Sequence, residues 1–158
     1  MIKTTGDGRC LFHSISLSLF GNVNYSHLLK IANVFFMLEN ESYFSKVLNQ
    51  QDRSLSFDQL VENNANDLVF GNHFSLMSLS GLIQRPIYSF TPFVANCLTT
   101  NPFYYNKQPV KIFLFNSHFS AILPLNCKSI VGEIPVTKNE LRNTIKRKID
   151  SVELIHLE

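Results

Sequence analysis

The chain has 158 residues, of which 45% are hydrophobic and 12% aromatic, so it is long enough to bury a core and too apolar to be disordered. Lys and Arg number 14 against 12 Asp and Glu, and the net charge of +2 is too small to indicate a nucleic-acid-binding surface. No apolar run is long enough to span a membrane, and the N-terminus has no signal-peptide pattern. We therefore expect one soluble domain over residues 1–158, without nucleic-acid or membrane partners.

The three cysteines, Cys10, Cys97 and Cys127, are odd in number and far apart in the sequence. This spacing fits neither a disulfide framework nor a zinc site with paired ligands, so no metal is expected. It favours a reducing compartment, which predicts an intracellular, cytoplasmic protein. We interpret Cys97 and Cys127 as structural residues.

The first half of the chain is predicted to be mainly helical. Apolar residues spaced by four follow Cys10, and Gly21 is placed to end this helix. Ser26 is the expected N-cap of a second helix, and a further helical stretch follows Glu41. Residues 56–59 read Ser-Phe-Asp-Gln, which has the form of a capping box and predicts another helix start.

The second half is predicted to carry the sheet. A helix at 73–83 is expected to end at Pro86, after which short β-branched and aromatic runs indicate strands at 86–90, 110–116 and 118–125. Residues 91–109 form the longest segment without a clear pattern and are predicted to be irregular. A closing amphipathic helix is expected at 137–149.

Cys10 stands where the Gly-Asp-Gly turn of residues 6–8 runs into the first helix. Backbone N–H groups at a helix start carry partial positive charge and favour the thiolate, the nucleophilic form of cysteine. The same turn would leave further N–H groups pointing into one concavity, as an oxyanion hole requires. The alternative is that Cys10 is a small buried apolar residue, as many free cysteines are.

A nucleophilic cysteine needs an imidazole brought near it by folding, and the chain has five histidines. His118 is the best candidate, because it lies at a turn between two apolar strands, where a rigid scaffold can present it to a cleft. His13 follows the cysteine by three residues and is expected to pack or to point away. His27 and His156 are expected at the surface, and His73 as a cap or a substrate contact.

Three segments of the chain together match a known pattern. Residues 7–12 read Asp-Gly-Arg-Cys-Leu-Phe, residues 70–90 run from Phe-Gly to Arg-Pro-Ile-Tyr-Ser-Phe, and residues 118–122 read His-Phe-Ser-Ala-Ile. In this order they resemble the motifs of the ovarian-tumour (OTU) family of papain-like cysteine proteases, most of which are deubiquitinases. Phe70 stands where that family often has tryptophan.

The resemblance implies an α+β fold of the papain-like OTU type, with a small central, mainly antiparallel sheet flanked by helices. It implies Cys10 as nucleophile, His118 as base and then acid, and the backbone of Gly8, Arg9 and Cys10 as oxyanion hole. The reaction would be hydrolysis of the isopeptide bond at the C-terminus of ubiquitin through a thioester, without a metal or organic cofactor. The expected partner is ubiquitin, polyubiquitin or a ubiquitin-like modifier, bound by a monomer.

Two features depart from the family pattern. The family usually has Asn or Asp two residues after the histidine, to orient the imidazole, and here that residue is Ser120. A hydroxyl accepts a hydrogen bond but brings no negative charge, so Ser120, Asp7 and Asn116 are all candidates for this role. Cys10 also lies close to Met1, which is typical of viral and mobile-element members or of a piece of a longer polyprotein.

Two other functions stay open at this stage. The serine at 120 is compatible with a weak or inactive OTU-fold module that binds ubiquitin, and a papain-like thiol can also transfer an acyl group to an acceptor other than water. The basic ubiquitin tail predicts an acidic channel, with Glu62, Asp67 and Glu133 as candidates. The candidates for contact with the apolar ubiquitin surface, each more often a core residue, are Phe70, Phe93, Phe103, Tyr104 and Tyr105.

Overall fold

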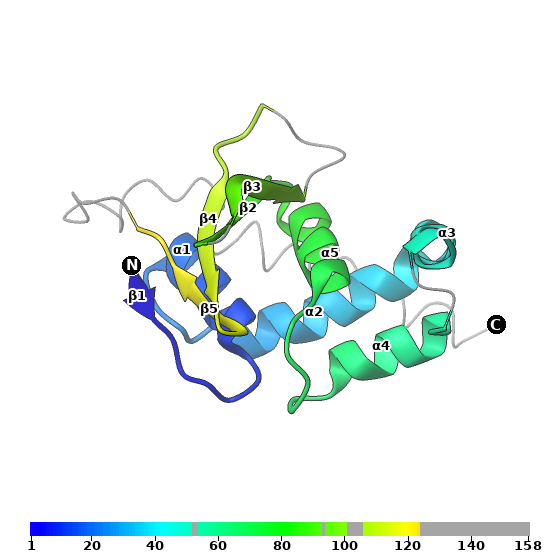
Figure 1. Ribbon diagram of the computed structural model, residues 1–158. Helices are drawn as coiled ribbons and strands as arrows, with labels where there is room; N and C mark the ends of the chain where they lie inside the picture. Colours follow the sequence, from blue (N-terminus) through cyan, green and yellow to red (C-terminus); the bar gives the residue numbers. More distant parts are fainter. Residues whose placement is uncertain (52–53, 93, 101–105, 124–158) are drawn as a thin grey trace.

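The computed structural model describes residues 1–51, 54–92, 94–100 and 106–123 (Figure 1). The helices in this part of the chain are α1 (Cys10–Phe20), α2 (Ser26–Glu39), α3 (Glu41–Gln51), α4 (Phe57–Ala65) and α5 (His73–Ile83). The strands are β1 (Ile2–Lys3), β2 (Ile87–Thr91), β3 (Val94–Thr100), β4 (Val110–Phe115) and β5 (His118–Ala121). The predicted helix at 137–149 and the residues Cys127, Glu133 and His156 lie outside the described residues.

The helix ends follow local signals in the sequence. Gly21 ends α1 in the left-handed conformation, with φ of 70°, and its N–H donates to the carbonyl of Leu17. The predicted capping box at 56–59 is present, because Ser56 and Gln59 exchange side-chain and backbone hydrogen bonds at the start of α4. An equivalent box, formed by Asn72 and Ser75, begins α5. These helix predictions are confirmed.

The predicted N-cap of α2 was wrong by one position. Ser26 is the first helical residue, and the cap position is Tyr25, which provides no side-chain cap. The Ser26 hydroxyl instead donates to the carbonyl of Val23, 2.7 Å away. The Ser26 hydroxyl therefore has its hydrogen-bond partner in the short loop after α1 and not in the first turn of α2.

The strands form one mixed sheet in the order β1-β5-β4-β2-β3. Only β2 and β4 pair in parallel, and the other three pairings are antiparallel, so the predicted mainly antiparallel sheet is confirmed. The sequence patterns missed β1 and β3. β1 has two residues, and β3 lies inside the segment predicted to be irregular, so both depend on pairing with a neighbouring strand and not on local propensity.

A two-residue turn joins β4 to β5. Phe115 pairs with His118, and the two residues between them, Asn116 and Ser117, both have positive φ angles of 49° and 59°. Paired positive φ angles are typical of the tight hairpin turn whose twist matches that of the flanking strands. His118 is therefore the first residue of a strand held in a fixed register.

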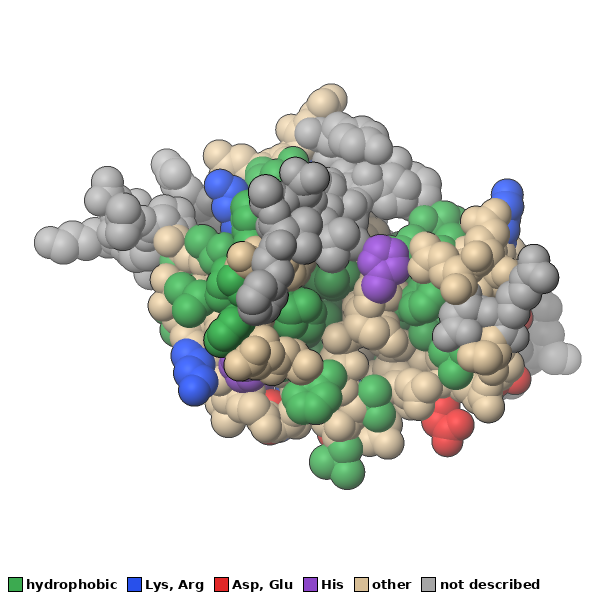
Figure 2. Space-filling view, viewed as in Figure 1, with side chains coloured by type: hydrophobic (Ala, Val, Ile, Leu, Met, Phe, Trp, Pro, Cys, Tyr) green, Lys and Arg blue, Asp and Glu red, His purple; other side chains and the backbone are tan. Residues whose placement is uncertain are grey.

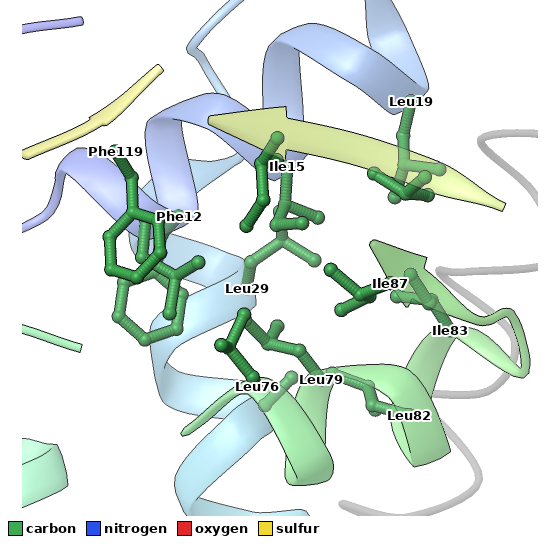
Figure 3. Packing of buried hydrophobic residues seen from close by; sticks show 14 of the residues in the cluster. Phe12, Ile15, Leu19, Leu29, Leu76, Leu79, Leu82, Ile83, Ile87 and Phe119 are labelled. Atoms are coloured by element: carbon green, nitrogen blue, oxygen red, sulfur yellow. The ribbon is translucent and has the colours of Figure 1, made fainter. Parts of the chain in front are cut away.

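The main core lies between the sheet and the helices α1, α2 and α5 (Figure 3). Fully buried residues come from every layer, including Phe12 and Ile15 of α1, Leu29 of α2, Leu79 of α5 and Ile87 of β2. A second cluster joins α2 to α3 and α4, on the side of the molecule away from the sheet (Figure 1). In the described residues no helix is long and apolar enough to cross a membrane.

The core also joins the two segments that carry the predicted site residues. Phe12 of α1 and Phe119 of β5 belong to the same buried cluster, and α1 packs directly against β5. Both α1 and β5 begin at the residue of interest, Cys10 and His118 respectively. Burial of these apolar side chains therefore brings the thiol and the imidazole to the same edge of the core.

Candidate active site

The segment before α1, residues 4–9, is here called the cysteine loop. Gly8 has φ of +81°, a conformation that favours glycine, and a Cβ there would overlap the backbone carbonyl of Asp67. Gly71 likewise lies against the side chain of Leu11. The loop between α4 and α5 thus packs closely on the cysteine loop and fixes its shape.

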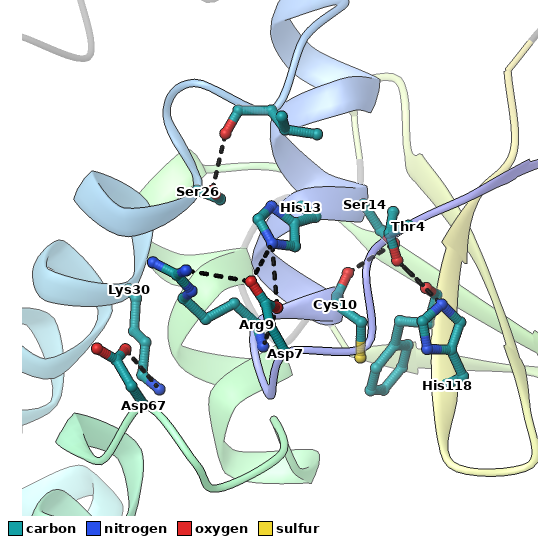
Figure 4. A network of polar contacts seen from close by, with 12 residues as sticks. Thr4, Asp7, Arg9, Cys10, His13, Ser14, Ser26, Lys30, Asp67 and His118 are labelled. Carbon is teal, nitrogen blue, oxygen red and sulfur yellow. Dashed lines mark hydrogen bonds and ion pairs between the residues drawn. The ribbon is translucent and has the colours of Figure 1, made fainter.

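Cys10 is the first residue of α1, and its side chain is fully buried. The cap position, Arg9, makes no side-chain hydrogen bond to the first turn, so the helix N–H groups there are not satisfied by a capping side chain. Figure 4 shows the Cys10 side chain directed to the side of α1 on which His118 lies. The geometry is that of a thiol at a helix N-terminus with an imidazole beside it.

The His118 ring is half-buried and is held by the residue that follows β1. Its Nε2 lies 3.2 Å from Oγ1 of Thr4, and the same Oγ1 lies 2.6 Å from the carbonyl oxygen of Phe119 (Figure 4). Thr4 reaches this position because β1 pairs antiparallel with β5, with Lys3 opposite Ser120. β1 therefore brings Thr4 to the imidazole at the start of β5.

Comparisons with known proteins bear on the fold that carries this arrangement. A family model described as the OTU domain of vertnin matches residues 1–64. The OTU-containing deubiquitinating enzyme 6 of Arabidopsis thaliana is 22% identical over 110 residues, which are 70% of this chain and 18% of that protein. The solved OTU domain of OTUD1 superposes with a TM-score of 0.63 at 15% identity, covering 78% of this chain and 83% of that one. The chain has the OTU fold.

A second solved structure has a similar fold. An OTU domain in complex with ubiquitin matches with a TM-score of 0.62 at 14% identity, over 91% of this chain and 84% of that one. At such identities the likeness establishes the fold, which is the α+β OTU fold implied by the sequence motifs. The chain spans about a fifth of the length of the curated relatives that it matches.

Asp7, predicted as one candidate to orient His118, has other partners in this OTU-fold domain. Its carboxylate accepts hydrogen bonds from the backbone and side chain of Arg9, at 3.0 and 3.1 Å, and lies 3.0 Å from Nε2 of His13 (Figure 4). Partial burial acts to raise the pKa of Asp7, but these hydrogen bonds outweigh it and lower the pKa from 3.8 to about 2. Asp7 therefore braces the cysteine loop, and within the described residues it makes no hydrogen bond to the imidazole of His118.

This bracing predicts a pH-dependent contribution to stability. Because the folded-state pKa of Asp7 is about 2 against an ordinary 3.8, the ionised carboxylate stabilises the fold above about pH 4 and loses this effect as the pH falls toward 2. We expect Asp7→Asn to lower the free energy of unfolding by about 1 kcal/mol near neutral pH, after allowance for solvent screening. Urea unfolding at several pH values measures the difference, and a gap that stayed constant down to pH 2 would contradict this role.

Within the described residues, the other two candidates for orienting His118 also make no hydrogen bond to its ring. Ser120 is buried in β5, and within the described residues its hydroxyl makes no hydrogen bond to His118. Asn116 occupies the hairpin turn. Thr4 makes the contact, and sequence reasoning missed it, because nothing in its local sequence indicates that β1 pairs with a strand more than a hundred residues away.

The three amides predicted to form an oxyanion hole differ in their hydrogen-bond partners. The Arg9 N–H donates to Asp7 and is therefore not available to a substrate oxygen, which corrects the prediction for this residue. The N–H groups of Gly8 and Cys10 have no partner within the described chain. These two amides, at the end of the cysteine loop and the start of α1, are the donors that remain for an oxyanion.

Of the remaining described histidines, His13 and His27 fit the roles expected of them, whereas the expectation that His73 is a cap was wrong. His13 is buried and bound to Asp7, and His27 is exposed. His73 is the first residue of α5, where Asn72 is the cap, and burial lowers its pKa. Among the residues that the structure describes, no three His, Cys, Asp or Glu side chains cluster as a metal site would require.

A buried lysine anchors the loop that packs on the cysteine loop. Lys30 of α2 is 3% exposed, and its Nζ donates to the carbonyl of Asn66 at 2.6 Å and lies 3.4 Å from the carboxylate of Asp67. Burial lowers the pKa of Lys30, against the opposing effect of Asp67. Beyond this anchor, Leu68 and Phe70 are 84% and 52% exposed, so Phe70 is a surface residue and not part of the core.

Proposed function

We propose that this OTU domain is a cysteine-dependent deubiquitinase that hydrolyses isopeptide bonds at the C-terminus of ubiquitin. The observation that carries the proposal is that Cys10, at the N-terminus of α1, is directed to the side on which an imidazole is held by a hydrogen bond to Thr4 (Figure 4). A module that only bound ubiquitin would need neither the thiol nor an oriented base. Relatives support the choice of substrate, since one is named a deubiquitinating enzyme and a similar structure is a ubiquitin complex.

The chemistry follows from these groups. The thiol proton passes from Cys10 to His118, and the thiolate attacks the carbonyl carbon of the C-terminal glycine of ubiquitin. The carbonyl oxygen becomes an oxyanion that the N–H groups of Gly8 and Cys10 stabilise. The C–N bond then breaks, the departing amine takes the proton from the imidazolium, and a thioester remains. Water, deprotonated by the imidazole, hydrolyses the thioester and restores the thiol.

Surface features of the described residues are compatible with ubiquitin as substrate. Ubiquitin presents an apolar patch and a basic tail. Phe70 and Phe115 are exposed and apolar, and Asp67, which is 56% exposed, stands beside the cysteine loop. Figure 2 shows hydrophobic side chains exposed on one face, where Lys and Arg lie scattered. A thiol nucleophile must stay reduced, so we propose a cytoplasmic location. We also propose that the protein acts as a monomer.

The decisive test is reaction with ubiquitin that carries a thiol-reactive group at its C-terminus. The wild-type protein is expected to form a covalent adduct, visible as a mass increase of one ubiquitin, and Cys10→Ala is expected to form none because the nucleophilic sulfur is gone. Cys10→Ser serves as the matched variant, since it keeps a buried polar side chain of similar size.

Two outcomes would refute parts of the proposal. An adduct that persists in Cys10→Ala would mean that another residue is the nucleophile. A folded wild-type protein that binds ubiquitin but neither forms the adduct nor cleaves a ubiquitin chain would be a binding module, the alternative that Ser120 suggested. Cleavage that transfers ubiquitin to an added amine in preference to water would indicate an acyl transferase.

A further inference from the structure

Thr4 is a buried residue beside the ring of His118. It follows β1 directly, is 7% exposed, and is separated from His118 by 114 positions in the sequence. Its Oγ1 is within hydrogen-bond distance of two groups, the carbonyl oxygen of Phe119 at 2.6 Å and the Nε2 of His118 at 3.2 Å. These two contacts together determine where the protons lie.

The hydroxyl of Thr4 has a single proton. The carbonyl oxygen of Phe119 can only accept, so the short contact between them uses that proton, with Thr4 as donor. Toward His118, Oγ1 can therefore only accept, and the nitrogen that faces it must carry a hydrogen. This requirement selects the neutral tautomer of His118 that is protonated at Nε2.

The opposite ring nitrogen is then the basic one. Nδ1 of His118 faces Gly6 of the cysteine loop, because a side-chain carbon placed on Gly6 would lie 4.0 Å from it. With Nε2 protonated, Nδ1 carries the lone pair that can take the proton of the Cys10 thiol. The hydrogen bond to Thr4 persists after this transfer, since Nε2 keeps its hydrogen in the imidazolium.

We propose that Thr4 is the residue that positions His118 and sets its tautomer, through a relay from Nε2–H of His118 to Oγ1 of Thr4 and from the Thr4 hydroxyl to the Phe119 carbonyl. Donation to a carbonyl polarises the hydroxyl and makes its oxygen a better acceptor, which compensates in part for the absence of a carboxylate. Thr4 thus takes the role that the sequence motif led us to expect of Ser120 or Asp7. The inference rests on the proposed function, in which His118 is the base.

The test compares Thr4→Val, which keeps the shape and removes the hydroxyl, with Thr4→Ser, which keeps the hydroxyl. Nitrogen NMR of the His118 ring, in protein held above the pH at which the ring becomes neutral, reports the tautomer without any substrate. We expect wild type and Thr4→Ser to be protonated at Nε2, and Thr4→Val to show a mixture of the two tautomers. A wild-type ring protonated at Nδ1 would overturn the proposal before any variant is made.

The kinetic arm uses the ubiquitin probe that reacts with Cys10. Thr4→Val is expected to lower the rate of adduct formation roughly tenfold to a hundredfold and to shift its pH profile, whereas Thr4→Ser and Ser120→Ala stay within about threefold of wild type. Equal losses in Ser120→Ala and Thr4→Val would refute the assignment to Thr4. Circular dichroism checks that each variant is folded.

The two arms separate this inference from the proposed function. If the wild-type protein has the expected tautomer but does not react with the ubiquitin probe, the relay stands and the choice of substrate is wrong. If it reacts, but Thr4→Val keeps both the wild-type rate and the Nε2-protonated ring, the function stands and the relay is wrong.

Discussion

His118→Gln is expected to lower the rate of ubiquitin release at least about a hundredfold, because general acid–base catalysis by a positioned imidazole contributes that much or more. Glutamine has nearly the same length and can still donate a hydrogen bond to Thr4, but it cannot take the thiol proton. The free energy of unfolding should change by only about 0.5 kcal/mol, since the ring is half-buried and lies at a strand end. Cleavage of a fluorogenic ubiquitin substrate measures the rate, and chemical unfolding measures stability.

The matched control is His27→Gln, the same substitution at an exposed position on α2. It is expected to leave both the rate and the stability unchanged. A wild-type rate in His118→Gln would show that this imidazole is not the base. Equal losses in the two variants would point to a general effect of removing a histidine.

Gly8→Ala is expected to destabilise the fold by about 2–4 kcal/mol and to reduce activity at the same time. The backbone at Gly8 has φ of +81°, and the new methyl group would overlap the Asp67 carbonyl, a backbone atom that cannot rotate away. The cysteine loop would have to move, and a displacement of about 1 Å beside a reacting group costs on the order of a hundredfold in rate. Thermal unfolding and the ubiquitin probe report the two effects.

Gly21→Ala separates the two causes of this loss. Gly21 has a similar φ of +70°, but no heavy atom lies within 4 Å of a Cβ built there. Its replacement should cost about 1 kcal/mol from backbone conformation alone and leave activity intact. If Gly8→Ala were no more damaging than Gly21→Ala, the packing of the Asp67 loop on the cysteine loop would not be important.

Helices were the most predictable part of the fold, because their signals lie within a few residues of each other. The capping box of Ser56 and Gln59 and the glycine that ends α1 were both readable in the sequence and both present in the structure. Ser26 shows the limit of such signals, since its hydroxyl donates a hydrogen bond to a carbonyl of the preceding loop. A cap is decided by competition among local acceptors, and the sequence does not rank them.

Strands were less predictable, because the residues that stabilise a strand by pairing can lie far away in the sequence. β4 and β5 have strong apolar patterns and a tight turn, and they were found. β1 and β3 have no such pattern, and each exists because a neighbouring strand offers its backbone N–H and C=O groups for pairing. The length and register of an edge strand are therefore set by its partner.

By itself, the sequence determined which groups to propose for the chemistry. Cys10 is recognisable from a turn that runs into a helix, and His118 from a turn between two apolar strands, because helix starts and hairpins are encoded locally. Only the tertiary structure decided how these groups are supported. It engaged the Arg9 amide and His13 with Asp7 and brought Thr4 to the imidazole across 114 positions. Hydrogen-bond partners depend on distances of a few tenths of an ångström, which arise only when strands and helices have packed.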